Sequence, residues 1–183
     1  VKCPNVFMGY FKDPEATSAT LVDGVLHSGD LGTFDADGFL TITGRKKDII
    51  ITAGGKNIAP KNIEAALKQD ELISEAVVIG DRRKYLSALI TIDPEVAGRL
   101  GISDGAPHES ARVREFVQRR VEIVNRDLAR VEQIKRFRVL PRALGIDTGE
   151  LTPTLKVKRN KVQEIWSREI EAMYAESPES LDL

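Results

Sequence analysis

The chain has 183 residues, of which 42% are apolar and 30% charged, a composition typical of a globular protein. Its 27 Lys and Arg nearly balance its 28 Asp and Glu, so no overall field would hold the chain on nucleic acid or on an anionic membrane. Cys3 is the only cysteine beside two histidines, which excludes an internal disulfide, shows no zinc-binding pattern and fits a reducing cytoplasm.

The first part of the chain, residues 1–46, is rich in turn signals. Pairs such as Asp23-Gly24, Gly29-Asp30 and Asp37-Gly38 separate short apolar stretches. This pattern predicts a run of β-hairpins without a helix, and it offers too little apolar mass for an independent core. Because the chain begins with neither Met nor an apolar leader, we interpret it as a piece of a longer polypeptide.

The rest of the chain, from about residue 48 to 176, alternates strand and helix signals and predicts a compact α+β domain, with a short mixed sheet flanked by helices. Pro60 is suited to the first turn of a helix, because its missing N–H does no harm there. In chain order we expect a strand over 48–52, a Gly-Gly loop, the helix that opens at Pro60, and strands over 75–79 and 87–92. An amphipathic helix should follow over 110–130, with an apolar stripe of Val113, Val117, Val121, Val124 and Leu128. The last elements are a strand over 135–140 and a helix over 161–174, whose inward residues are Val162, Ile165, Trp166, Ile170 and Met173.

Four cations gather just before and into the start of the last helix: Lys156, Lys158, Arg159 and Lys161. A helix N-terminus carries partial positive charge, so each cation there costs a few tenths up to about 1 kcal/mol. The arrangement indicates a visiting anion, such as a phosphate, a carboxylate or a nucleic-acid backbone. A solvated basic turn is the alternative.

Three segments, in matching order and spacing, resemble one family, the adenylate-forming acyl-CoA synthetases. Asp23 to Gly32 is similar to the DGW-x-x-TGD motif, with Val25 in place of the usual aromatic residue and Ser28 in place of threonine. Thr43 to Ile58 is similar to the hinge and the loop that follows it, and Leu151 to Arg159 is similar to the C-terminal lysine motif. The form LTPTLKVKR most resembles the long-chain fatty-acid branch.

The resemblance implies an ATP-dependent fatty-acid–CoA ligase. A fatty acid and ATP would give an acyl-adenylate and pyrophosphate, after which a small C-terminal domain rotates and the CoA thiol displaces AMP. Residues 1–46 would be the β-rich end of the large adenylation domain, and residues 47–183 the small mobile lid. ATP, CoA, a long-chain fatty acid and Mg²⁺ carried with ATP are then expected. The phosphate loop lies in the family's N-terminal domain, so we predict that this chain alone is inactive.

The same resemblance gives roles to residues before the lid's helices. Asp30 would accept hydrogen bonds from the ribose hydroxyls of ATP, and Arg45 would add a charged contact to the nucleotide. Lys47 stands at the hinge position. Gly54 and Gly55 would border the pantetheine arm of CoA, and Lys56 would meet a CoA phosphate.

Lys156 matches the lysine that acts in adenylation. Its ammonium would bridge the carboxylate and the α-phosphate, where negative charge develops in the transition state. The family's general form has glycine before this lysine, whereas Leu155 stands here. Lys158, Arg159 and Lys161 would either support the local potential or remain solvated.

Two alternatives remain. One is an adenylating enzyme with a carrier-protein acceptor, such as a fatty acyl-AMP ligase. The other is a non-catalytic nucleic-acid-binding module, against which the aromatic content of 5% counts because no stacking platform accompanies the cations. The sequence leaves acyl-chain length, oligomeric state and any peripheral membrane contact open.

Overall fold

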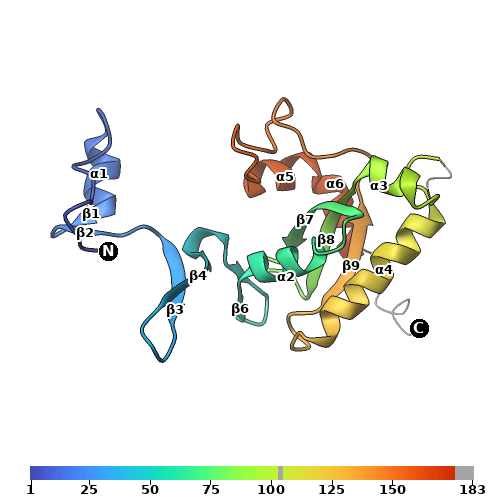
Figure 1. Cartoon of the computed structure of the whole chain (residues 1–183), viewed down its shortest axis with the longest axis horizontal. Coiled ribbons are helices and arrows are strands. Elements are labelled where there is room, and N and C mark those ends of the chain that lie inside the picture. Colours follow the sequence, from blue (N-terminus) through green and yellow to red (C-terminus); the bar gives the residue numbers. More distant parts are fainter. Residues whose placement is uncertain (103–104, 176–183) are drawn as a thin grey trace. The chain divides into compact units, whose positions relative to one another are not determined.

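The chain divides into two units, Val1–Lys47 and Asp48–Leu183, in a computed structural model that describes residues 1–102 and 105–175 (Figure 1). The expected lid, 47–183, therefore includes two stretches, 103–104 and 176–183, that lie outside the described residues. Within the described ranges, no helix is both long enough and apolar enough to cross a bilayer.

Unit 1, Val1–Lys47, combines short hairpins with one feature that the sequence analysis missed. Strands β1 (Leu21–Val22) and β2 (Val25–Leu26) pair antiparallel, as do β3 (Asp30–Phe34) and β4 (Leu40–Arg45). The prediction of no helix is wrong, because α1 spans Pro14–Thr20.

Helix α1 begins at an Asp-Pro pair. The Asp13 carboxylate accepts a hydrogen bond from the Ala16 N–H at 2.9 Å, and Pro14 occupies the first turn. Unit 1 has no buried apolar cluster among its described residues, and Met8, Phe11, Phe34 and Phe39 are exposed. Its hairpins therefore form without a core of their own.

Unit 2, from Asp48 onward, is built on a three-stranded mixed sheet. Strands β7 (Ile73–Ile79) and β8 (Leu86–Ile92) pair antiparallel, and β9 (Ile134–Val139) adds parallel to β8. The predicted strands and the α+β class are confirmed, with boundaries shifted by one or two residues. Because β8 is central, all seven of its residues are buried.

The two faces of this sheet carry separate apolar cores. Val78 and its partner Ala88 belong to the first core, which α2 (Pro60–Leu67), α3 (Pro94–Arg99) and α4 (Ala111–Arg126) cover. Val77 and its partner Leu89 belong to the second core, beneath α5 (Arg159–Ile165) and α6 (Ser167–Ala175). The helices thus enclose the sheet from both sides, as Figure 1 shows.

Helices α3 and α4 differ from expectation at their ends. The short α3 was not predicted, although Asp93 caps it and Pro94 opens it, as at α1. Helix α4 follows its predicted Val stripe but stops at Arg126, four residues early. The Asn125 side chain donates to the Ile134 carbonyl and accepts from the Ile134 N–H, both at 2.9 Å, so the chain turns there into β9.

The predicted C-terminal helix is in fact two helices that meet at Trp166. The Trp166 indole N–H donates to the buried Glu150 carboxylate at 2.6 Å. Val162, Trp166, Ile170 and Met173 are buried as expected, whereas Ile165, the last residue of α5, is 39% exposed.

The hairpin before α2 completes unit 2. Strands β5 (Ile50–Ile51) and β6 (Asn57–Ile58) pair antiparallel, and Ile50 and Ile58 enter the first core. The strand predicted over 48–52 is shorter than expected, because a 3₁₀ turn, η1 (Lys46–Asp48), occupies its start.

Candidate functional site

Asp30 and Arg45 lie opposite each other on paired strands of unit 1. They are register partners in β3 and β4, and Arg45 Nε donates to Asp30 Oδ1 at 3.0 Å. The Arg45 side chain is 66% exposed and that of Asp30 29%. The two residues predicted to bind the nucleotide therefore form one exposed charged pair.

Lys47 is the last residue of unit 1 and the middle residue of the turn η1. It is exposed and belongs to neither core. The boundary between the two units falls directly after it.

Gly54 and Gly55 form the tip of the β5–β6 hairpin, and only one of them is required by the backbone. Gly55 has φ +77°, a conformation that strains other residues. Around Gly54 there is open space, and a Cβ there would meet only Thr52 Oγ1, at 3.9 Å. The local fold therefore gives no steric reason for glycine at 54.

The tip is braced by the turn between β7 and β8. The Ala53 N–H donates to the Arg83 carbonyl at 2.9 Å. The Arg83 guanidinium pairs with both oxygens of Glu171 on α6 and lies 4.8 Å from the centre of the Tyr174 ring. The hydrogen bonds from Arg83 lower the pKa of Glu171, and those bonds likewise raise the pKa of Arg83.

Lys156 sits at the tip of a second hairpin, closed by the bridge between Leu151 and Val157. The Thr152 N–H donates to the Lys156 carbonyl at 2.8 Å, and the Lys156 N–H donates to Thr152 Oγ1 at 3.0 Å. The Lys156 side chain is exposed and forms no ion pair with any residue that the structure describes. Its ammonium is therefore available to an external anion.

The Lys156 hairpin repeats the local geometry of the Gly54-Gly55 hairpin. The Thr52 N–H donates to the Lys56 carbonyl and Lys56 N–H to Thr52 Oγ1, at 3.1 and 3.2 Å, as Thr152 and Lys156 do. Leu155 takes the position of Gly55, with φ +59°. Two Thr-x-x-x-Lys segments thus form the same loop, a spacing that the sequence analysis passed over.

Two of the other three cations near Lys156 have partners within the fold. Arg159 binds Glu64 of α2, and Arg159 Nη1 donates to the Val78 carbonyl at 3.0 Å. Lys161 binds Glu164 at 2.8 Å on the same helix. The hypothesis of one anion-binding cluster is therefore wrong for Arg159, whose charge is neutralised inside unit 2.

The two hairpins are rooted in different cores. Ile50 and Ile58 anchor the Gly54-Gly55 hairpin in the first core, whereas Leu151 and Val157 pack on the second. The sheet lies between these cores, and Figure 1 shows the two hairpins projecting at separate places on unit 2. The structure does not bring Lys156 together with Gly54, Gly55 and Lys56.

Glu150, which the sequence analysis did not single out, lies at the base of the Lys156 hairpin and is fully buried. Its carboxylate binds Arg142 at 2.5 Å and Trp166 Nε1 at 2.6 Å, and it also accepts from Thr148 and from the Gly145 N–H. Burial acts to raise the pKa of Glu150, but these hydrogen bonds outweigh it and hold that pKa below its ordinary value. The Glu150 carboxylate is therefore ionised at neutral pH.

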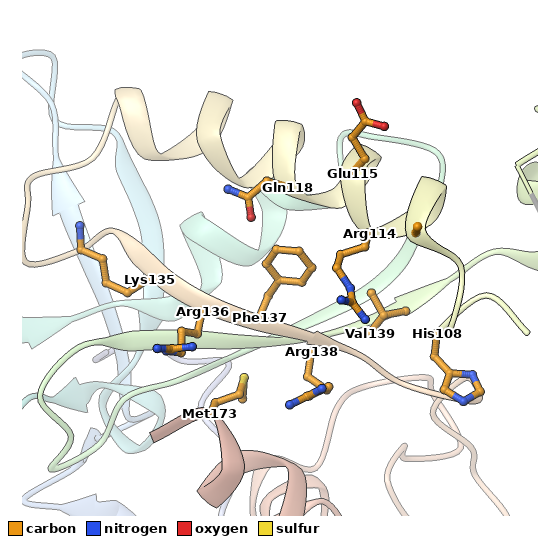
Figure 2. Close-up of a pocket in the computed structure, with 11 residues that line it drawn as sticks. His108, Arg114, Glu115, Gln118, Lys135, Arg136, Phe137, Arg138, Val139 and Met173 are labelled. Atoms are coloured by element: carbon orange, nitrogen blue, oxygen red, sulfur yellow. The ribbon is translucent and has the colours of Figure 1, made fainter. Parts of the chain in front are cut away.

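A cavity of about 530 Å³ lies beside β9, between α4 and α6 (Figure 2). Figure 2 shows Phe137 directed toward α4, while Arg136 and Arg138 lie on the side of Met173. None of the described residues that line the cavity belongs to the set assigned from the sequence. In the same described ranges, no cluster of three or more His, Cys, Asp or Glu could hold a metal ion.

Curated relatives match nearly the whole chain. Long-chain-fatty-acid–CoA ligase FadD15 of Mycobacterium tuberculosis is 46% identical over 177 residues, which cover 92% of this chain and 30% of that protein. Long-chain-fatty-acid–CoA ligase ACSBG1 of Mus musculus is 38% identical, over 93% of this chain and 27% of its own length. The chain thus spans less than a third of the length of these relatives.

Solved structures share the fold. The adenylation domain of a carboxylate reductase from Mycobacterium chelonae superposes with a TM-score of 0.79 at 27% identity, covering 93% of this chain and 26% of that one. An adenylation and carrier didomain of a carboxylic acid reductase from Segniliparus rugosus, in complex with AMP, also gives 0.79, at 25% identity, over 95% of this chain and 24% of that one.

The sequence pattern described as the AMP-binding enzyme C-terminal domain matches residues 47–178, which are most of the chain. Together with the 46% identity to a ligase, this match confirms the resemblance stated from the motifs. The chain belongs to the family of AMP-binding enzyme C-terminal domains.

Proposed function

We propose that this chain is the C-terminal portion of an ATP-dependent long-chain fatty-acid–CoA ligase. In the first step the fatty-acid carboxylate attacks the α-phosphate of ATP, and pyrophosphate leaves. In the second step the CoA thiolate attacks the acyl carbon of the acyl-adenylate, AMP leaves, and a thioester forms. The observation that carries the proposal is the exposed Lys156 at a hairpin tip, in a chain 46% identical to such a ligase.

Lys156 would serve the first step. Charge grows on the oxygens between the carboxylate and the α-phosphate, and a fixed ammonium favours that transition state over the ground state. The Thr152 hydroxyl accepts a hydrogen bond from the Lys156 N–H and so fixes the backbone there. The role is also supported by the absence of an ion pair to the Lys156 ammonium within the described residues.

Asp30 and Arg45 would hold the nucleotide. A carboxylate offers several acceptor sites in one plane, which suits two neighbouring ribose hydroxyls, and a guanidinium suits a phosphate or a ring oxygen. Their mutual hydrogen bond orients both groups before ATP arrives. Lys47, at the boundary of the two units, would absorb the backbone rotation between the two steps.

The Gly54-Gly55 hairpin would serve the second step. Open space at Gly54 admits the pantetheine arm, and the exposed Lys56 would meet a CoA phosphate. Because this hairpin and the Lys156 hairpin are rooted in different cores, one rigid domain could present each in turn.

The proposal requires a larger adenylation domain, of which unit 1 would be the last part. The exposed Phe34 and Phe39 and the missing apolar cluster in unit 1 support this, because such side chains are normally covered. We therefore expect the 183-residue chain alone to be inactive. In the cell the whole enzyme would work in the cytoplasm, with Mg²⁺ entering bound to ATP and membrane contact at most peripheral.

The test is Lys156→Ala in the full-length enzyme, with the two half-reactions assayed separately. We expect fatty-acid-dependent exchange of pyrophosphate into ATP to fall on the order of 10²–10³-fold, and thioester formation from supplied acyl-adenylate to remain largely intact. Lys161→Ala, which removes an exposed cation paired with Glu164, is the matched control. Unchanged exchange in Lys156→Ala would overturn the assignment.

A carrier-protein acceptor is the second candidate, favoured by the similarity to an adenylation and carrier didomain. Lys56→Glu distinguishes the two acceptors. If CoA is the acceptor, reversing the charge should raise the KM for CoA several-fold while pyrophosphate exchange stays unchanged. An unaltered KM for CoA would favour the carrier or another contact for the phosphate.

A nucleic-acid-binding module gains no support from the structure. Two of the four cations on which that alternative rests, Arg159 and Lys161, already have carboxylate partners. A salt-dependent affinity for mixed oligonucleotides would revive it.

A further inference from the structure

Glu150 joins the Lys156 hairpin to the body of unit 2. The Glu150 carbonyl accepts a hydrogen bond from the Lys158 N–H at 2.8 Å, so its backbone closes the base of the hairpin that begins at Leu151. Its side chain points into the fold and has no exposed surface. Glu150 therefore adds a polar link between the loop of the proposed adenylation lysine and the second core, beside the apolar packing of Leu151 and Val157.

The partners of Glu150 come from three directions. Arg142 lies in the segment after β9, Thr148 in the turn before Glu150, and Trp166 at the junction of α5 and α6. The Arg142 guanidinium also lies 4.9 Å from the centre of the Trp166 ring, so the three side chains of Arg142, Glu150 and Trp166 fix one another. These contacts add to the Leu151–Val157 bridge in holding the base of the hairpin.

Arg142, Glu150 and Trp166 form what we call the Arg142–Glu150–Trp166 node. The way the hydrogen bonds divide between the two oxygens of Glu150 means that this position requires an ionised carboxylate. Oε2 accepts from Arg142, Thr148 and the Gly145 N–H, while Oε1 accepts from Trp166. Arg142, the Gly145 N–H and the Trp166 indole N–H can only donate, so a side-chain amide would place its NH₂ against a donor at one of the two oxygens. Glutamine fits the space but not the hydrogen bonds.

Arg142 compensates the charge of Glu150. The pair is 2.5 Å apart, with Glu150 fully buried and the Arg142 side chain 39% exposed. Glu150 is thus not the counter-ion of Lys156, and no ion pair to Lys156 occurs within the described ranges. The node can fix the hairpin without withdrawing the ammonium from a substrate.

We propose that Glu150 is a positioning residue for Lys156, acting through the Arg142–Glu150–Trp166 node at the base of the hairpin. This rests on the proposed function, because it concerns the step that Lys156 serves. A displacement of about 1 Å can lower a rate 10²-fold, so a loosened base affects adenylation even though Glu150 touches no substrate. The thioester-forming step does not use this hairpin and is spared.

The test is Glu150→Gln in the full-length enzyme, with Glu164→Gln as the matched control, since Glu164 is 68% exposed and binds only Lys161 among the described residues. We expect pyrophosphate exchange in Glu150→Gln to fall on the order of 10–10²-fold in kcat, with little change in the KM for ATP. Thioester formation from supplied acyl-adenylate should stay within about twofold of the parent, as should both half-reactions in Glu164→Gln.

A double-mutant cycle separates positioning from general damage. If Glu150 acts through Lys156, Glu150→Gln should cause no further loss of exchange in a Lys156→Ala background. Full additivity, an equal loss of both half-reactions, or no loss at all would overturn the inference. If Lys156→Ala itself leaves exchange intact, the proposed function fails first, and the two failures remain distinguishable.

Trp166→Phe provides a milder second variant in case Glu150→Gln folds poorly. It removes only the indole N–H that donates to Glu150 and keeps an aromatic ring against Arg142. We expect a smaller loss of exchange, again without effect on thioester formation. Normal exchange in a folded Trp166→Phe enzyme would contradict the role of the node.

Discussion

Arg159 should be a structural residue, unlike its neighbours in the basic cluster. Strand β7 lies at the edge of the sheet, and the outward backbone groups of Val78 are capped by two charged side chains. The Val78 N–H donates to Glu64 Oε1 at 2.8 Å, and Arg159 Nη1 donates to the Val78 carbonyl at 3.0 Å. Arg159 and Glu64 also bind each other.

Arg159→Ala would leave the Val78 carbonyl without its side-chain donor and the Glu64 carboxylate without its counter-ion, although Glu64 still accepts from the Val78 N–H. An unsatisfied buried polar group costs about 1–3 kcal/mol, and breaking a buried ion pair about 3–5 kcal/mol. Because the side chains of Arg159 and Glu64 keep 17% and 14% exposure, water relieves part of this cost. We expect the free energy of unfolding to fall by about 2–4 kcal/mol.

The assay is urea denaturation of the chain, followed by the fluorescence of Trp166, its only tryptophan. Lys161→Ala is the control, because its ion pair with Glu164 is exposed and worth about 0–1 kcal/mol. Arg159→Met combined with Glu64→Gln should be more stable than Arg159→Met alone, since the unpaired charge is gone. If Arg159→Ala costs no more than Lys161→Ala, the reasoning is refuted.

Two further predictions concern the hairpin tips and pH. Leu155→Gly should raise the free energy of unfolding by about 0.5–1 kcal/mol, because it relieves the left-handed strain at φ +59° and removes a side chain that is already 67% exposed. Gly55→Ala, at φ +77°, should lower the free energy of unfolding by about 1 kcal/mol. Thermal unfolding midpoints of the two variants would check both. The folded-state pKa values of Glu150 and Glu171 lie below their ordinary values, so both groups stabilise the fold above about pH 4.3, and this stability is lost as pH falls through the lowered pKa values. Urea midpoints should therefore decrease from pH 7 to pH 3. The difference in urea midpoint between the parent chain and Glu150→Gln should become smaller over the same range, and a constant difference would contradict a lowered pKa for Glu150.

Local signals were enough to predict most of unit 2. The Val stripe of α4 and the β-branched runs of β7 and β8 have one clear period each. The missed helices α1 and α3 both begin with Asp-Pro, a capping signal that was present at Asp13 and Asp93. They were overlooked because each is only six or seven residues long and lacks a full apolar stripe.

Other features depend on contacts distant in sequence, which no local pattern contains. The break between α5 and α6 falls at Trp166, whose indole N–H donates to Glu150, sixteen residues earlier. The charge of Arg159 is compensated by Glu64, ninety-five residues earlier. Family motifs identified Lys156 and Asp30 as candidates. They could not show that Arg159 binds the edge strand β7 and Glu64, whereas Lys156 has no such partner among the described residues.

Rooting the two hairpins in opposite cores also bears on how such a domain can evolve. Substitutions that share no partners usually have additive effects on free energy, whereas those within one packed cluster do not. The apolar anchors of the Gly54-Gly55 hairpin lie in the first core and those of the Lys156 hairpin in the second, and polar contacts such as those of Arg83 and Arg159 link a hairpin to the opposite side. Substitutions among the apolar anchors of one hairpin should then have effects nearly additive with those of the other, so the two loops could change largely independently across a family.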